Sequence, residues 1–413
     1  MEVYLDNAAT TRVDDCVVDL MAKVMREDFG NPSSKHMKGV EAEHYLKEAL
    51  KTLAGILKVQ EKEIILTSGG TESNNMALIG AAMASMRKGK HVISTCFEHP
   101  SVLEPLKYLE RFACPDGGRF EIQYLPVDRQ GHVDPDELAG AIRPDTILVT
   151  TMFVNNEIGA VQDVSRLGQI IKEKNPQCLY HVDAIQAFGK YPIFPKRMNI
   201  DLLSVSGHKI HGPKGVGFLY KKENVRIQPL ILGGGQQKGM RSGTDNVPGA
   251  AGLSMAAHNA YQELPAHVSR LISLKDRLID GLEQFAAEVR ADAQDPGTDP
   301  AGKKKKETGY IRVNSLKGEA GAPHIVSATF YPVKSEVMLH ALEDKGIYVS
   351  SGSACSSNKP GLSGTLQSIG LSAKEADCTL RFSFSRYNSE EEVDYTLKSI
   401  REAYGVLSRF TSY

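Results

Sequence analysis

The sequence predicts an α/β protein whose larger part holds a mostly parallel β-sheet. Between about residues 45 and 260, short apolar runs alternate with helix-like stretches. Many of these runs are β-branched or end in small polar residues, as buried parallel strands do when polar loops follow their carboxyl ends. Strands that alternate with helices form layered domains. Active-site groups in such folds gather beyond the carboxyl ends of the strands, so we expect the functional residues there.

The individual elements follow from the apolar pattern along the chain. The expected strands of the large sheet are Glu63–Thr67, His91–Thr95, Thr146–Val154, Leu179–Val182, Leu202–Val205 and Val216–Tyr220. Helices are expected at Met76–Met86 and at about 262–290. Further on, the strand-like His324–Tyr331 alternates with the helix-like Ser335–Lys345 and Ser389–Gly405. This second alternation predicts a smaller α/β domain.

We expect a large domain over 16–260 and a small domain made of 1–15 and 261–413. The segment 291–308 is rich in Pro, Gly and charged residues, which predicts a solvated loop rather than a boundary between independent domains. A second stretch at about 350–366 is rich in Gly, Ser and Pro, which favours a surface loop. This second loop contains Cys355.

Composition limits the possible partners and the compartment. Lys plus Arg is 49 against 50 for Asp plus Glu, which gives no reason to expect nucleic acid or an anionic membrane as a partner. The sequence opens without a signal peptide, and no run is apolar enough to span a bilayer, so we expect a cytoplasmic protein. Six cysteines without CxxC or zinc-finger spacing predict free thiols and no metal site.

A candidate phosphate cradle follows the first expected strand. The stretch 68–75 contains Gly69, Gly70 and Thr71 and leads into a helix-like segment. Glycines let backbone amides approach an anion, Thr71 can cap the helix and donate its hydroxyl, and a helix amino end favours phosphate. The alternative is a capped turn that binds nothing, because the motif is neither a P-loop nor a dinucleotide fingerprint.

Two further strand ends carry an acid and a lysine. Asp183 follows a largely apolar strand, and burying its carboxylate is costly unless a cation such as a protonated pyridine nitrogen pairs with it. Lys209 lies between an apolar strand and a Gly/Pro-rich turn, where a partly desolvated amine can form a Schiff base. Ser206 and His208 flank this lysine and could bind phosphate. The alternatives are a helix-capping Asp183 and an ordinary surface lysine. Lys209 is preferred to Lys214 because it stands at the strand end.

Polar residues at two more strand ends complete the candidate site. His99 follows the strand His91–Thr95, and its flat ring could stack on a planar cofactor, although a lone histidine is more often a hydrogen-bonded structural residue. Asn155 and Asn156 follow another strand and could reach polar atoms of a ring or a substrate. Together, a phosphate cradle, a buried acid, a lysine and an imidazole describe a pyridoxal-phosphate pocket.

Eight motifs, in their order along the chain, resemble those of a known family. They are Leu5–Thr11, Gly30–Ser34, Ser68–Asn74, Val154–Gly159, His181–Gln186, Ser206–Lys209, Arg241–Thr244 and Ser351–Cys355. This set resembles the NifS/IscS-type cysteine desulfurases, which have the class V aminotransferase type of fold. The resemblance covers nearly the whole chain, although the segment 291–308 departs from the family pattern. It implies a fold-type I pyridoxal-phosphate-dependent transferase with a mostly parallel seven-stranded sheet, a smaller α/β domain and a homodimer.

The resemblance also implies a role for each matching residue. Lys209 would form the Schiff base with pyridoxal phosphate, and Asp183 would pair with the pyridinium nitrogen. Gln186 would bond the ring hydroxyl, His99 would stack on the ring and assist proton transfer, and Asn156 would lie near the ring oxygen and the substrate. The residues implied to hold the phosphate are Gly70, Thr71, Ser206 and His208, joined by Thr244 of the second subunit. Arg381 would bind the substrate carboxylate, a bidentate task that suits guanidinium.

The implied activity is that of a cysteine desulfurase. L-cysteine would become L-alanine, and the Cys355 thiolate would take the sulfur as a persulfide for delivery to an acceptor protein, in iron–sulfur cluster assembly or thiolation. One alternative is a selenocysteine lyase or another small pyridoxal-phosphate-dependent lyase or aminotransferase. A second alternative is a sulfur carrier with little catalysis, which should have lost Lys209 or Asp183.

Overall fold

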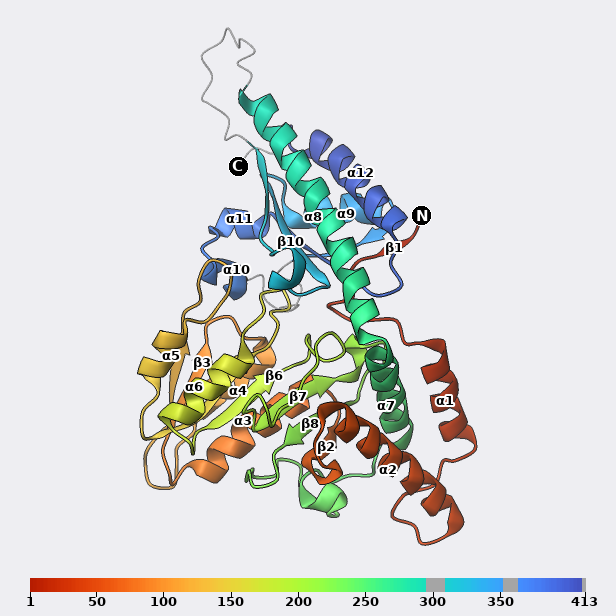
Figure 1. Ribbon diagram of the computed structural model, residues 1–413, viewed down its shortest axis with the longest axis vertical. Helices are drawn as coiled ribbons and strands as arrows, with labels where there is room; N and C mark the ends of the chain where they lie inside the picture. The colour runs from red at the N-terminus through yellow and green to blue at the C-terminus, as the bar shows by residue number, and fades with distance from the viewer. Residues whose placement is uncertain (295–308, 352–362, 411–413) are drawn as a thin grey trace.

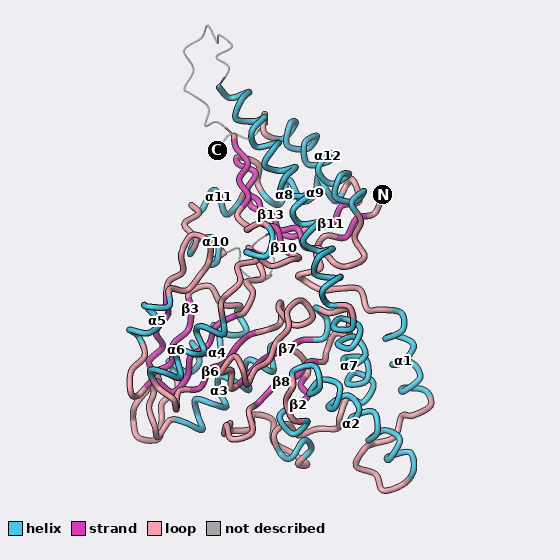
Figure 2. Tube along the Cα trace, in the orientation of Figure 1, coloured by secondary structure: helices cyan, strands magenta, loops and turns pink. Residues whose placement is uncertain are grey.

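A computed structural model describes residues 1–294, 309–351 and 363–410 of the chain. Figure 1 shows a large sheet covered by helices in its lower part and a smaller sheet with its own helices in its upper part. The long helix α8 (Leu264–Gln294) runs from the flank of the large sheet to the smaller one. Figure 2 shows the same arrangement, with helices surrounding the strands of the large sheet.

The large sheet has seven strands in the order β2-β8-β7-β6-β5-β3-β4. In that order they span Ile64–Thr67, Gly217–Lys221, Leu202–Ser206, Leu179–Asp183, Thr146–Met152, His91–Thr95 and Glu121–Leu125. All neighbouring pairs from β7 to β4 are parallel, and β8 is antiparallel to both of its neighbours. The prediction of a mostly parallel sheet in an α/β fold is therefore confirmed.

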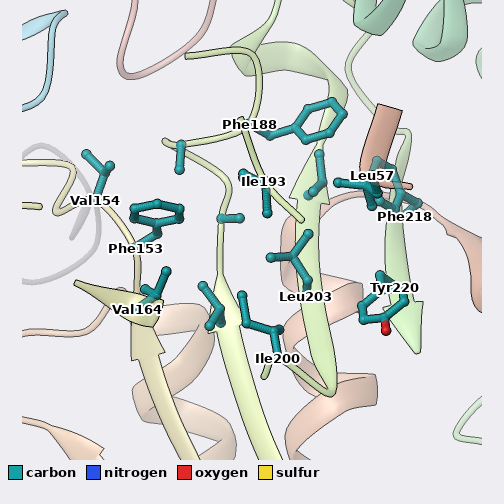
Figure 3. Packing of buried hydrophobic residues seen from close by; sticks show 14 of the residues in the cluster. Leu57, Phe153, Val154, Val164, Phe188, Ile193, Ile200, Leu203, Phe218 and Tyr220 are labelled. Carbon is teal, nitrogen blue, oxygen red and sulfur yellow. The ribbon is translucent and has the colours of Figure 1, made fainter. Parts of the chain in front are cut away.

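Successive residues of the central strands face opposite sides of the sheet, and each side is covered by helices. On β3, Val92 packs with Leu78 of α3 and Val102 of α4 in one cluster, whereas Ile93 belongs to the large cluster on the opposite side. The two covering helices on the first side are α3 (Gly70–Ser85) and α4 (Pro100–Arg111). The opposite side is covered by α2 (Met37–Leu57), α5 (Pro135–Ala141), α6 (Val164–Lys174) and α7 (Val247–Gln262). Figure 3 shows part of this opposite cluster, including Phe188 and Phe218.

The smaller sheet has four antiparallel strands in the order β12-β13-β10-β9. In that order they span Ser350–Ser351, Thr379–Ser383, Ile325–Tyr331 and Tyr310–Val313. Near the amino terminus, β1 (Val3–Tyr4) pairs in parallel with β11 (Ile347–Tyr348). The first residues thus lie beside the carboxyl-terminal region, and the division into 16–260 against 1–15 with 261–413 remains a prediction.

The remaining elements complete the chain. The other α-helices are α1 (Asp15–Arg26), α9 (Ser335–Glu343), α10 (Gly364–Ser368), α11 (Ala373–Asp377) and α12 (Glu390–Leu407). The short 3₁₀ helices are Glu61–Glu63, Gly207–Lys209, Gln236–Gly239 and Gly318–Ala320. No helix within the described ranges is long and apolar enough to cross a membrane.

Two expectations about boundaries need correction. The loop expected at 291–308 begins later, because α8 continues to Gln294 through residues with adequate helix propensity, and residues 295–308 lie outside the described residues. The strand expected at Thr146–Val154 ends at Met152. The chain bends at residue 153, and Val154 forms an isolated bridge with Val161.

Candidate active site

The polar residues at the strand ends surround one cavity of about 300 Å³. Strands β2, β3, β5, β6 and β7 all run in one direction, so their carboxyl ends meet at the same edge of the sheet. The predicted residues that line the cavity are Gly70, Thr71, His99, Asn156, Asp183, Gln186, Ser206, His208 and Lys209. Lys214, the other lysine considered, is exposed and does not line it.

Among the described residues, three predicted polar residues do not line this cavity: Asn155, Arg381 and Thr244. Asn155 is fully buried, and its amide forms hydrogen bonds with Phe97 and Thr365 instead. Arg381 lies on β13 of the smaller sheet, and Thr244 is exposed in the segment before α7. Cys355 lies outside the described residues. The amino-terminal residues Ala8 and Ala9 form part of the wall, a role that strand-end reasoning did not assign.

Asp183 ends β6 as a buried carboxylate, 5% exposed. Its Oδ1 accepts the backbone N–H of Ile185 at 3.0 Å, and its Oδ2 accepts a hydrogen bond from Asn74 Nδ2 at 2.8 Å. Burial raises the pKa of this carboxyl, while the hydrogen bonds and the neighbouring His99 oppose the rise. Neither hydrogen bond supplies a full positive charge, so a protonated ring nitrogen would relieve the cost of keeping this carboxylate ionised.

The turn before α3 is shaped for an anion. Gly69 is the N-cap with φ +146°, a conformation open to glycine, and no side chain caps the helix. Gly70 has no room for a side chain, because an added Cβ would lie 2.1 Å from Ile185 Cδ1. Because Gly69 is the N-cap, Thr71 lies inside the first turn of the helix and is not the cap that the sequence suggested. An uncapped helix amino end facing a cavity suits a phosphate group.

Lys209 follows β7 in the short 3₁₀ helix Gly207–Lys209. Its Nζ donates to the backbone oxygens of Ala8 at 2.5 Å and Ala9 at 2.6 Å. Its own backbone oxygen accepts a hydrogen bond from Lys190 Nζ at 2.8 Å. The amine that would carry the cofactor is thus held against the amino-terminal segment.

Gln186 has both ends of its amide engaged. Its Nε2 donates to the Ala8 oxygen at 2.9 Å, and its Oε1 lies 3.1 Å from His324 Nε2. Because Gln186 Oε1 can only accept, His324 carries its proton on Nε2. Burial and the nearby cations lower the pKa of His324 well below its usual value, so the ring is neutral. Sequence reasoning gave His324 no role, although the residue opens a predicted strand.

Of the residues expected at the phosphate, Ser206 is buried and His208 is held by two threonine side chains of the amino-terminal segment. Ser206 is 3% exposed at the end of β7. His208 Nδ1 lies 3.3 Å from Thr10 Oγ1, and the His208 oxygen accepts from Thr11 Oγ1 at 3.0 Å. Burial, together with Lys209, lowers the pKa of His208 to about 4, so its ring is neutral at pH 7.

His99 is the N-cap of α4 and lies beside Asp183 and Lys209 in the cavity. Its Nδ1 accepts the backbone N–H of Ser101 at 3.1 Å and lies 2.8 Å from Ser101 Oγ. Burial lowers the pKa of His99, Lys209 adds to the lowering, and Asp183 opposes it. Sequence reasoning identified His99 but not Ser101, whose polar position in the first helical turn was the available signal.

Arg381 reaches from the smaller sheet to the edge of the cavity. Its Nη1 donates to the Asn156 oxygen at 2.9 Å, and its Nη2 donates to Asp6 Oδ1 at 2.8 Å. The side chain is buried, and Nε has no hydrogen-bond partner among the described residues. A buried guanidinium with an unused N–H beside a cavity residue can bind a carboxylate ligand by donating hydrogen bonds to it. Sequence reasoning missed Asp6, which lies in a quoted motif.

These residues fit pyridoxal phosphate. The uncapped helix end suits its phosphate, the buried Asp183 suits its protonated ring nitrogen, and Lys209 offers the amine for its aldehyde. A small cavity enclosed by these three groups leaves room for one flat ring between them.

Comparison with known proteins agrees with this geometry. The model of the class V aminotransferase family matches residues 3–299 and 298–396. Cysteine desulfurase IscS of Methanosarcina thermophila is 42% identical over 400 residues, covering 97% of this chain and 91% of that protein. A solved NifS-like protein has a TM-score of 0.84 and 37% identity over 97% of this chain and 99% of its own. The structure of SspA in complex with cysteine has a TM-score of 0.73 and 31% identity over 94% and 100% of the two chains.

Proposed function

Because the chain belongs to the class V aminotransferase family and is one of its pyridoxal-phosphate-dependent cysteine desulfurases, we propose that it moves sulfur from L-cysteine to Cys355. The observation that carries this proposal is a single cavity that holds the Lys209 amine, the Asp183 carboxylate and the His99 ring. The similar protein SspA, whose structure was solved in complex with cysteine, supports the choice of substrate.

The proposed binding roles follow from the contacts of each residue. Asp183 holds the ring nitrogen, Gln186 lies beside the ring, and Lys209 carries the cofactor through its amine. The uncapped amino end of α3 holds the phosphate together with the hydroxyl of Ser206 and the ring of His208. When bound, pyridoxal phosphate supplies an electron-poor ring that draws electrons from the substrate carbon.

The transfer step balances without an outside oxidant. The C–S bond of the substrate breaks while an S–S bond to Cys355 forms, and one thiol proton ends on the methyl group of alanine. The substrate carbon is reduced, and the two sulfur atoms share the oxidation as a persulfide. Arg381 would anchor the substrate carboxylate, and the Lys209 amine would accept the proton from Cα.

The chain on either side of Cys355 supports its proposed role. On one side, Ser350 of β12 pairs with Arg381 of β13. On the other side, Ser363 Oγ donates to Glu157 Oε2, next to Asn156 in the cavity wall. The described residues that flank the segment containing Cys355 therefore lie near the substrate-binding groups on both sides.

A homodimer is also proposed. Leu230, Ile231 and Leu232 are 38%, 41% and 81% exposed, and they precede Thr244 in the same segment. Neighbouring exposed apolar residues of this size favour burial against another protein surface. A second copy would cover them and bring its Thr244 to the phosphate, which light scattering of wild type and Leu232→Asp can test. A monomeric wild type would refute the dimer.

The destination of the sulfur is proposed to be an acceptor protein in iron–sulfur cluster assembly or thiolation, in the cytoplasm. The described cysteines Cys16, Cys96, Cys114, Cys178 and Cys378 are free thiols, which suits a reducing compartment. The name IscS of the relative does not identify the acceptor. Sulfur-35 transfer from labelled cysteine to candidate acceptors would identify it.

The central experiment compares absorbance spectra, alanine and sulfide for wild type, Lys209→Ala and Cys355→Ala, with dithiothreitol as reductant. We expect a cofactor band in wild type, with alanine and sulfide lost in both variants. Lys214→Ala and Cys16→Ala are matched controls on exposed residues and should keep full activity. Full turnover of cysteine by Cys355→Ala would contradict the persulfide step and favour a lyase or an aminotransferase.

A further inference from the structure

A chain of hydrogen bonds connects His99 to Asp183 through two residues that have no assigned role. Asn74 Nδ2 lies 2.8 Å from Asp183 Oδ2 and 2.9 Å from Ser101 Oγ. Ser101 Oγ lies 2.8 Å from His99 Nδ1. Asn74 is fully buried and Ser101 is 7% exposed, so water does not compete for these bonds.

The direction of each bond follows from the groups involved. A carboxylate can only accept, so the Asn74 amide must turn its NH₂ group toward Asp183. Its second N–H then points to Ser101 Oγ, which accepts it and keeps its own proton for another partner. The partner in reach is His99 Nδ1.

A backbone hydrogen bond also requires His99 Nδ1 to act as an acceptor. The Ser101 N–H can only donate, and it lies 3.1 Å from Nδ1. Nδ1 therefore faces two donors and must offer a lone pair. A proton on Nδ1 would oppose the backbone N–H, so the neutral ring carries its proton on Nε2.

The place of His99 in α4 strengthens this assignment. As the N-cap, its ring accepts a bond at the positive end of the helix, which disfavours an imidazolium. The charged groups that act on His99 are Asp183 and Lys209, of which only Asp183 favours the cation. An imidazole kept neutral in this way presents an N–H to the cavity.

From this geometry we propose that Ser101 and Asn74 are positioning residues that hold His99 as the Nε2–H tautomer. His99 then enters the reaction as a hydrogen-bond and proton donor. The tautomer follows from the protein alone, whereas its use as a donor rests on the proposed desulfurase reaction.

Nitrogen-15 NMR of histidine-labelled protein tests the tautomer, with and without pyridoxal phosphate. The His99 signals are assigned with His99→Gln. In wild type we expect Nδ1 to resonate as an unprotonated nitrogen and Nε2 as a protonated one, in both forms. A protonated Nδ1 in either form would overturn the proposal, even if the enzyme desulfurates cysteine normally.

A graded series at position 101 tests the assigned cause. Ser101→Thr keeps both donors, Ser101→Ala keeps only the backbone N–H, and Ser101→Pro removes both at a helix position that tolerates proline. We expect the wild-type tautomer in the threonine and alanine variants and the appearance of Nδ1–H in the proline variant. An unchanged tautomer in a folded proline variant, shown by circular dichroism, would overturn the role of Ser101.

Kinetics supply a second readout that does not depend on the proline variant. Ser101→Ala and Asn74→Leu should each lower kcat by about tenfold or less, the effect of one hydrogen bond, with little change in KM. Ser101→Thr should restore kcat. Equal activity of Ser101→Ala and wild type would overturn the positioning role. A wild-type protein that shows the expected tautomer but does not desulfurate cysteine would instead count against the proposed reaction and leave the tautomer assignment standing.

Discussion

Glu98 gives the sharpest test of the electrostatics beneath the active site. This residue is 4% exposed, directly before His99. Its Oε1 accepts from Thr95 Oγ1 at 2.6 Å and from the Met152 N–H at 2.9 Å, while Oε2 is buried without a partner in the described structure. Burial raises the pKa of the Glu98 carboxyl from 4.5 to about 8, and nearby Asp183 adds to the rise. We therefore expect Glu98 to be a neutral acid at pH 7.

The expected effect of Glu98→Gln depends on pH in a definite direction. The pKa is raised on folding, so between pH 4.5 and 8 the native state binds more protons than the unfolded state, and its stability falls as pH rises. At about 1.4 kcal/mol per pKa unit, wild type should lose roughly 3 kcal/mol between pH 5.5 and pH 8 because of this one group. Gln keeps the accepting oxygen and does not ionise, so the variant should gain about this much relative to wild type.

Urea unfolding of both apoproteins at pH 5.5 and pH 8 measures this difference. Glu137→Gln, an exposed residue in the first turn of α5, is the matched control and should show no such change. A constant offset at every pH does not affect this comparison; one is expected because the Gln amide also lacks a partner at the Oε2 position. If the gap between wild type and Glu98→Gln is the same at both pH values, Glu98 ionises like an exposed acid and the reasoning is wrong.

Three other substitutions follow from the same contacts. Burial, aided by Lys209, lowers the pKa of Lys190 from 10.5 to about 7, so the buried charge destabilises the folded protein most below pH 7. In thermal scans, Lys190→Met should therefore raise the melting temperature most below pH 7 and least near pH 10.5. Gly70→Ala should weaken pyridoxal-phosphate binding at least about tenfold in reconstitution titrations, because its Cβ would overlap Ile185. Arg381→Lys should raise KM for cysteine about tenfold with a smaller change in kcat, since a lysine cannot reproduce the bidentate guanidinium.

Most strands of the large sheet were predictable because they are buried on both faces, and such strands appear in a sequence as continuous apolar runs. Strand β4 was not predicted: it is an edge strand, its residues from Glu121 to Tyr124 are exposed or only partly buried, and no apolar run marks it. The antiparallel direction of β8 was not predicted either, although a signal existed. The ten residues between β7 and β8 leave no room for a crossover helix, and parallel neighbours need one.

The candidate site was predictable where a polar residue ends an apolar strand. Asp183 and His99 were found in this way, and both line the cavity. Asn74 was not found, because its importance depends on which face of α3 it occupies, and many polar residues begin helices. The pairing of Asp6 with Arg381 joins positions 375 residues apart, and no local pattern connects them.

The missed residues explain why the amino-terminal segment lies where it does. Ala8 accepts hydrogen bonds from the Lys209 amine and from the Gln186 amide, while Asp6, two residues earlier, holds Arg381. The same short segment therefore touches the amine that would carry the cofactor and the guanidinium that would bind the substrate. Since β1 pairs with β11 of the smaller region, a shift of that region would pull on both groups together. Cofactor and substrate sites are thus joined by backbone contacts, which a search for polar motifs cannot reveal.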